Sequence, residues 1–197
     1  GYLAHSLLGE PPRDIRVCLD SEGSFAGTFG LMYEDQAMLA GALGYLPDSP
    51  CLFEAAALAR SEGVTYSFDF GVMKESTHVN AMKFVLTGES GKVATLVGDS
   101  TGGGMVQTRL VNGFPLRVIG DCYVVLLLDR AEVLAATEVE DWAHGLAGYL
   151  ESGVSHASGP GRLYFVKLAA LPDRSAAQAR FPDITLDLLT PVLPVLA

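Results

Sequence analysis

The sequence AMKFVLTGESGKVATLVGDSTGGGMVQTRLV, residues 81–111, decides the fold because apolar residues recur in it with a period close to two. Three such runs cover residues 81–87, 92–98 and 105–111, and the glycine-rich segments 88–91 and 101–104 separate them. Successive side chains of a β-strand point to opposite faces of a sheet, so this period predicts strands. Short glycine-rich connections predict that neighbouring strands run antiparallel.

The flanking sequence extends this pattern on both sides. Apolar runs at 64–70 and 116–128 predict further strands, and residues 14–20 predict the first strand of the chain. Between that first strand and the run at 64–70, the sequence predicts helices at 34–46 and 52–61. A strand, two helices and then a succession of strands indicate an α+β fold, in which helices cover one face of a mixed, mostly antiparallel sheet.

The C-terminal third of the chain is predicted to add further helices. We expect them at 133–150, 163–171, 175–181 and 186–196, with a glycine- and serine-rich loop at 152–161. The chain is therefore divided into residues 1–129 and a helical C-terminal extension, residues 130–197, which is either part of the same core or a small subdomain. The amphipathic end of this extension also suits docking on a partner or a second copy, so a purely structural role in assembly stays open.

The bulk composition limits the classes of function. The chain has 197 residues, of which 49% are hydrophobic, enough for one core. Its net charge of −10 repels phosphate backbones, so we expect no nucleic-acid partner. The sequence contains neither an apolar run of roughly 18 residues nor an export signal, which predicts a cytoplasmic protein with no membrane partner. Cys18, Cys51 and Cys122 are far apart and fit no metal loop, so no metal is expected in this chain.

Several short motifs occur in order between residues 14 and 129. They are GSFAGT (23–28), LAGALG (39–44), HVNAMKF (78–84), STGGG (100–104) and NGF (112–114). In this order they resemble G-S-x-A-x-T, A-G-L-L-G, H-P-N-T-M-K-F, S-I-G-G-G and N-G-F, the motifs of the β-chain domain of bacterial iron–sulfur L-serine dehydratases. Each motif alone is a weak signal, whereas five in one order are specific. We therefore interpret residues 1–129 as a serine-dehydratase β-like domain.

The resemblance implies a β-type subunit or fragment of an L-serine ammonia-lyase-like enzyme. In that interpretation the chain binds a small amino-acid substrate, and a [4Fe–4S] cluster on an α-type partner chain assists the loss of the β-substituent. The partners implied are the amino acid and the α-type serine dehydratase subunit, in a homo- or hetero-oligomer. A related module in some phosphoglycerate dehydrogenases binds a small effector without chemistry, so the fold alone does not decide the function.

One departure from the family motifs bears on catalysis. Where the family carries G-H-G-T-D, with a histidine thought to act in catalysis, this chain has Leu31-Met32-Tyr33-Glu34-Asp35. Met32 takes the histidine's position, and a thioether cannot accept a proton. This substitution motivates the alternative of a non-catalytic amino-acid-binding or scaffold module. Asp35 matches the motif and is a candidate catalytic residue that holds the ammonium group, or it serves the helix macrodipole.

The resemblance also suggests a pocket for the charged ends of an amino acid. Candidate substrate-binding residues are Ser24, Thr28, Asn80, Ser100, Gly102, Gly103 and Gly104. Hydroxyls and the backbone N–H groups of a glycine-rich turn can bind a carboxylate, although the same segments suit ordinary connections in which glycine supplies a positive φ. His78 is the second candidate catalytic residue. With Asn80 it is expected to open a strand on one face, where it orients substrate or shuttles a proton, or else caps a turn.

A further motif lies far along the chain. Residues 155–162, SHASGPGR, resemble S-H-T-A-G-P-x-R, which in the family precedes the first strand. Ser155 and His156 are therefore added to the candidate substrate-binding residues. A circular permutation, a second half-site and a coincidence in a glycine- and serine-rich loop all remain open.

Overall fold

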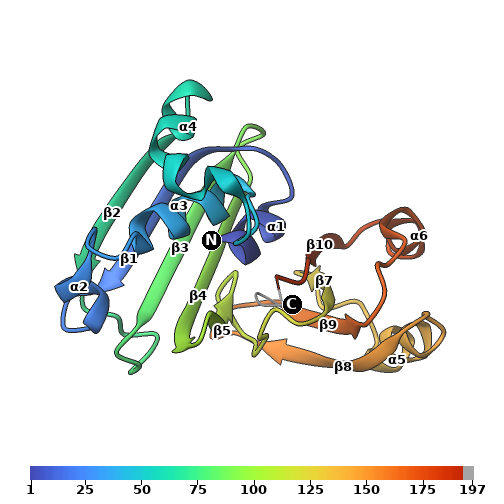
Figure 1. The fold of residues 1–197 in the computed structure, drawn as a ribbon. Coiled ribbons are helices and arrows are strands. Elements are labelled where there is room, and N and C mark those ends of the chain that lie inside the picture. The colour runs from blue at the N-terminus through green and yellow to red at the C-terminus, as the bar shows by residue number, and fades with distance from the viewer. Residues whose placement is uncertain (193–197) are drawn as a thin grey trace.

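The computed structural model describes residues 1–192, and it contains two sheets with helices packed against them (Figure 1). The first sheet has six strands in the order β2-β1-β3-β4-β5-β6. They are β1 (Pro12–Asp20), β2 (Thr65–Gly71), β3 (Ala81–Gly88), β4 (Val93–Gly102), β5 (Met105–Val111) and β6 (Phe114–Pro115). β1 and β2 are parallel and the other pairs are antiparallel, so the predicted α+β class with a mixed, mostly antiparallel sheet is confirmed.

The strands of this sheet follow the alternation of the sequence. In β3, Met82, Phe84 and Leu86 are buried, while the side chains between them are half-buried. Phe84 pairs with Val17 of β1 and with Leu96 of β4, so the three side chains lie side by side in the main core. Full burial of an apolar side chain of this size contributes about 2 kcal/mol to folding.

Helices from the first half of the chain cover one face of the sheet (Figure 1). They are α1 (Tyr2–Leu8), α2 (Ser24–Thr28), α3 (Glu34–Leu43), the short 3₁₀ helix η1 (Pro50–Glu54) and α4 (Ala55–Ser61). α1 and α3 cross at close range, because a Cβ atom on Gly41 would lie only 2.7 Å from the backbone nitrogen of Tyr2. The absence of a side chain at Gly41 therefore permits this crossing.

The second sheet consists of four strands in the order β10-β7-β9-β8. Its elements follow the chain as β7 (Tyr123–Asp129), α5 (Ala136–His144), β8 (Tyr149–His156), β9 (Arg162–Leu168), α6 (Arg174–Arg180) and β10 (Thr185–Leu189). This β-α-β-β-α-β succession, with antiparallel pairing between all neighbours, is the ferredoxin-like arrangement.

Several helices predicted for the C-terminal third are wrong. The segments at 163–171 and 186–196 form mainly β9 and β10, and the segment at 133–150 is helical only in α5 before it enters β8. Residues 193–196 of the last prediction lie outside the described residues. Short apolar runs in a buried strand and in a buried helix look alike by periodicity, which explains the error. The helix predicted at 175–181 is confirmed as α6.

Strand β7 connects the two sheets through its two faces. Val124 and Leu126 belong to the main core, whereas Val125 and Leu127 pack with α5 and α6 in a second core. Because one strand serves both cores, the two sheets are packed together. The predicted division of the chain at residue 129 stays a prediction.

An ion pair between a half-buried lysine and a buried aspartate also joins the two sheets. The ammonium group of Lys92, in the turn before β4, lies 2.6 Å from a carboxylate oxygen of Asp187 in β10 and donates to the carbonyl oxygens of Leu7 and Leu8. Lys92 thus holds the C-terminal end of α1 and the second sheet together.

Among the helices of residues 1–192, none is both long and apolar enough to cross a membrane.

Candidate functional site

Three segments of the chain meet at Asn80. The side-chain amide oxygen of Asn80 accepts a hydrogen bond from the hydroxyl of Ser24, at the start of α2. The backbone carbonyl of Asn80 accepts the N–H of Ser100 in β4 at 3.1 Å. The backbone N–H of Ser24 donates to the carbonyl of Val79 at 2.8 Å, and a Cβ atom on Gly23 would collide with that same oxygen. The structure therefore brings together Ser24, Asn80 and Ser100, which the sequence places 56 and 20 residues apart along the chain.

His78 belongs to the same segment but not to a strand. β3 begins at Ala81, so the expectation that His78 and Asn80 open a strand is wrong. The pair lies in a turn, in which Nδ1 of His78 accepts the backbone N–H of Asn80 at 3.1 Å. Turn-forming hydrogen bonds between a side chain and a nearby backbone group compete with strand pairing. The contact between His78 and Asn80 therefore comes from the turn and not from a shared strand face.

A buried carboxylate holds this turn in place through Ser76. Asp99 in β4 has no exposed surface, and it accepts hydrogen bonds from the Ser76 hydroxyl at 2.7 Å and from Nε of Arg109 at 2.5 Å. Ser76 in turn accepts the backbone N–H of His78 at 3.1 Å. The sequence analysis missed Asp99 and Ser76. The available signal was an acidic residue directly after the apolar run at 92–98, because a buried charge requires partners.

The glycine-rich turn and Thr28 play simpler structural roles. Gly103 and Gly104 form the two-residue turn between β4 and β5, and both have positive φ, at 60° and 77°. Positive φ at both central positions is what a tight hairpin of this kind requires. The hydroxyl of Thr28 donates to the carbonyl of Ser24 one turn earlier in α2. Gly102 is exposed at the end of β4.

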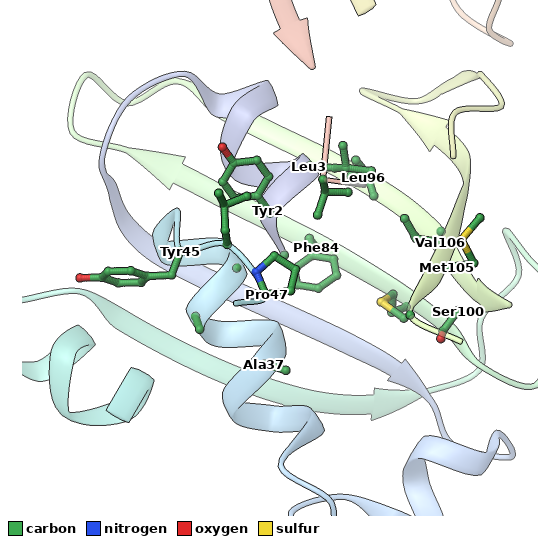
Figure 2. Close-up of a pocket in the computed structure, with 18 of the residues that line it drawn as sticks. Tyr2, Leu3, Ala37, Tyr45, Pro47, Phe84, Leu96, Ser100, Met105 and Val106 are labelled. Atoms are coloured by element: carbon green, nitrogen blue, oxygen red, sulfur yellow. The ribbon is translucent and has the colours of Figure 1, made fainter. Parts of the chain in front are cut away.

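An apolar cavity of about 240 Å³ lies between the helices and the first sheet (Figure 2). Tyr2 and Ala37 line it from α1 and α3, and Phe84 lines it from the sheet. Ser100 lies at one end, beside Met105 of the next strand, as Figure 2 shows. Gly104 also lines this cavity. The backbone N–H of Ser100 donates to the backbone carbonyl of Asn80, and Ser100 also lines the cavity. The cavity therefore adjoins the polar cluster formed by Ser24, Asn80 and Ser100.

Met32 lies two residues before α3, and Asp35 lies within its first turn. Asp35 is half-buried in the first turn of the helix and accepts a hydrogen bond from the Gln36 side chain at 3.2 Å. Ala37, two residues further along, lines the cavity. Met32 is 74% exposed, and its backbone N–H donates to the carboxylate of Glu34. The position at which the family carries a histidine is thus on the surface of this chain.

Ser155 and His156 lie apart from this cluster. They end β8 in the second sheet, and residues 157–161 form the connection to β9. The Ser155 hydroxyl donates to the carbonyl of Pro115 at 2.5 Å. Both residues line an open groove with Arg117 and Lys167, which has no lining residue in common with the cavity. The structure therefore does not bring the SHASGPGR segment to Asn80.

The residues of this chain do not fit an iron–sulfur cluster. Cys18, Cys51 and Cys122 are free and lie in β1, in η1 and just before β7. Burial raises the pKa of the Cys122 thiol to about 11, which disfavours the thiolate that a metal needs. Within residues 1–192, no three His, Cys, Asp or Glu side chains are grouped closely enough to hold a metal ion. The expectation of a cluster on a partner chain stays a prediction.

The fold and these contacts define an α+β domain in which an apolar cavity ends at a polar cluster. No family model matches the chain. It is 32% identical over 110 residues to the L-serine dehydratase β chain of Peptoniphilus asaccharolyticus, a match that covers 56% of this chain and 49% of that one. It is 29% identical over 130 residues to the probable L-serine dehydratase β chain of Bacillus subtilis (strain 168), covering 65% and 56%.

These matches confirm the resemblance that the motifs indicate, and the chain contains a domain similar to the β chain of L-serine dehydratase. The matched region spans about half the length of these curated relatives.

Proposed function

We propose that this chain is the substrate-binding part of an L-serine dehydratase-like lyase and that an α-type chain supplies the elimination chemistry. The observation that carries the proposal is the meeting of Ser24, Asn80 and Ser100, of which Ser100 lines the cavity. The two β-chain relatives support the class of substrate and the existence of a partner.

The cluster has groups for both charged ends of an amino acid. The hydroxyls of Ser24 and Ser100 and the side-chain NH₂ group of Asn80 are donors for a carboxylate. An ammonium group requires acceptors, which the backbone carbonyls of the turn supply. The cavity next to Ser100 excludes water from one side of the ligand, which strengthens these hydrogen bonds.

Exposed apolar side chains near the start of α3 and at Val79 support a partner chain. Leu31, Met32, Tyr33 and Phe53 are each more than half exposed, and Val79 adds a further apolar side chain next to Ser24. Clustered apolar exposure of this kind is typical of protein–protein contact sites. In this proposal the α-type chain covers these side chains and brings its own catalytic groups, including the [4Fe–4S] cluster, to the bound amino acid.

The test is pyruvate formation from L-serine after anaerobic reconstitution with an α-type L-serine dehydratase chain. We expect activity with the unaltered chain and at least a tenfold loss with Asn80→Ala, because the carboxylate loses one donor and Ser24 loses its acceptor. The matched control is Ser90→Ala, in the exposed turn between β3 and β4. Equal rates for Asn80→Ala and Ser90→Ala contradict the assignment of the site.

A second candidate function is amino-acid binding without catalysis, and the surface position of Met32 favours it. Methionine cannot act as a proton acceptor, so the catalytic role of the family's histidine is missing unless another chain provides it. The two candidates differ in one result. A binding module takes up L-serine on its own and forms no pyruvate with any α-type chain, whereas an enzyme subunit takes up L-serine and forms pyruvate once an α-type chain is added.

A further inference from the structure

A continuous chain of hydrogen bonds runs from the buried Asp99 to the candidate site. The Asp99 carboxylate accepts from the Ser76 hydroxyl, and the Ser76 oxygen accepts from the backbone N–H of His78. The ring of His78 then accepts from the backbone N–H of Asn80, whose side chain contacts Ser24. Apart from the contact of Asn80 with Ser24, these contacts join residues at most 23 positions apart, so the network is built mainly by β4 and the segment before β3.

The chemistry of each group fixes the direction of these hydrogen bonds. An ionised carboxylate only accepts, so the hydroxyl hydrogen of Ser76 points to Asp99 and a lone pair of Ser76 faces His78. Arg109, at 2.5 Å, supplies the positive charge that a fully buried carboxylate requires. The orientation of the Ser76 hydroxyl is therefore set by Asp99.

The same reasoning fixes the tautomer of His78. A backbone N–H can only donate, so Nδ1 of His78 must hold a lone pair where it accepts the N–H of Asn80. In a neutral imidazole the proton then resides on Nε2, which is a donor. Nε2 makes no hydrogen bond to a residue in the described range 1–192, which leaves it available to a ligand.

We propose that Asp99 is a positioning residue that acts through Ser76: Ser76 holds the backbone of His78 in the turn, and in this turn the N–H of Asn80 on Nδ1 keeps the ring proton on Nε2, as a hydrogen-bond donor to the carboxylate of the ligand. His78 then anchors the ligand and does not abstract its proton. The identity of the ligand in this statement rests on the proposed function, whereas the tautomer and its dependence on Ser76 and Asp99 do not.

Nuclear magnetic resonance of the full chain with ¹⁵N-labelled histidine tests the proposal. A long-range ¹H–¹⁵N correlation spectrum separates the protonated from the bare ring nitrogen, and His78→Gln identifies the signals of His78. We expect the Nε2–H tautomer in the unaltered chain at a pH where the ring is neutral. In Ser76→Ala the N–H of His78 loses its acceptor, and we expect a mixture of tautomers, which Ser76→Thr reverses because it restores the hydroxyl.

Asp99→Asn provides the second variant. An asparagine keeps one acceptor oxygen, and Arg109, which can only donate, takes it, so the NH₂ group faces Ser76. The Ser76 hydroxyl then loses its acceptor and its oxygen is shared between two donors, which weakens its contact with the N–H of His78, and we expect the His78 signals to shift toward the mixture. The signals of His5, His144 and His156 report whether the rest of the fold is intact. An Nδ1–H tautomer in the unaltered chain overturns the proposal, as does an unchanged His78 spectrum in both Ser76→Ala and Asp99→Asn.

Addition of L-serine separates this proposal from the proposed function. A shift of the His78 Nε2–H signal with L-serine, and none with serinol, which lacks the carboxylate, supports both. If the tautomer follows Ser76 as expected but L-serine shifts no signal, the role of Asp99 in holding the ring stands and the assigned ligand is wrong.

Discussion

Asn80 is the residue on which the candidate site depends, because α2, the turn before β3 and strand β4 all contact it. Its neighbours His78 and Ser24 follow from the motifs alone, since both stand in segments that resemble the dehydratase β chain. Asp99 and Ser76 do not follow from those motifs. Their importance comes from burial and from the pairing of two segments, and neither is visible in a linear pattern.

Met32 and Asp35 show how far a motif match carries at this scale. The match places both residues in a catalytic segment, but the structure has Met32 on the surface and Asp35 in the first turn of α3. A carboxylate in the first turn of a helix is favourable with or without a ligand, because it faces the positive end of the helix dipole. Both interpretations of Asp35 therefore fit its position, and its role stays a prediction.

At the scale of elements, the first sheet is largely predictable, whereas in the second sheet only β7 is predicted, as the end of the apolar run at 116–128. The strands of the first sheet are separated by glycine turns and are buried on one face, so their alternation is visible in the sequence. In the second sheet, Tyr123–Asp129 is buried along nearly its whole length, and β10 is short and mostly buried. A strand covered on both faces loses its alternation, which is why the runs that contain β9 and β10 resemble helices.

The close crossing of α1 and α3 gives a prediction at this scale. Gly41→Ala places a methyl group 2.7 Å from the backbone of Tyr2, and backbone atoms cannot move aside without shifting a helix. We expect a loss of about 1–3 kcal/mol in the free energy of unfolding, measured by urea denaturation. The matched control is Gly27→Ala in α2, where a Cβ atom meets nothing within 4 Å. A Gly41→Ala variant as stable as Gly27→Ala would show that the two helices are further apart than described.

At the scale of the whole molecule, the two sheets are joined by a shared strand and by one ion pair. β7 contributes a face to each core, and Lys92 connects α1 to β10 through Asp187. The cavity is lined by α1 and also by Val192, which follows β10, so the second sheet is close to the candidate site. The position of the second sheet was not predictable, because the pairing of Lys92 with Asp187 joins residues 95 apart in sequence.

This ion pair gives a prediction for the molecule as a whole. Lys92→Met leaves the buried carboxylate of Asp187 without its partner, and we expect the free energy of unfolding to fall by about 2 kcal/mol. The double variant Lys92→Met/Asp187→Leu should recover part of this loss, because it removes both charges. Arg16→Met, which breaks an exposed pair with Asp14, serves as the control and should change stability by less than about 1 kcal/mol. Equal effects of Lys92→Met and Arg16→Met on urea denaturation argue against a structural role for the pair.

The most direct test of the central claim is isothermal titration calorimetry of the full chain with L-serine. The account predicts saturable binding by the unaltered chain and by Ser90→Ala, and an affinity at least tenfold weaker for Asn80→Ala and for Ser24→Ala, with all variants folded by circular dichroism. No heat of binding with the unaltered chain, or equal affinities for all four proteins, would contradict a site formed where Ser24, Asn80 and Ser100 meet.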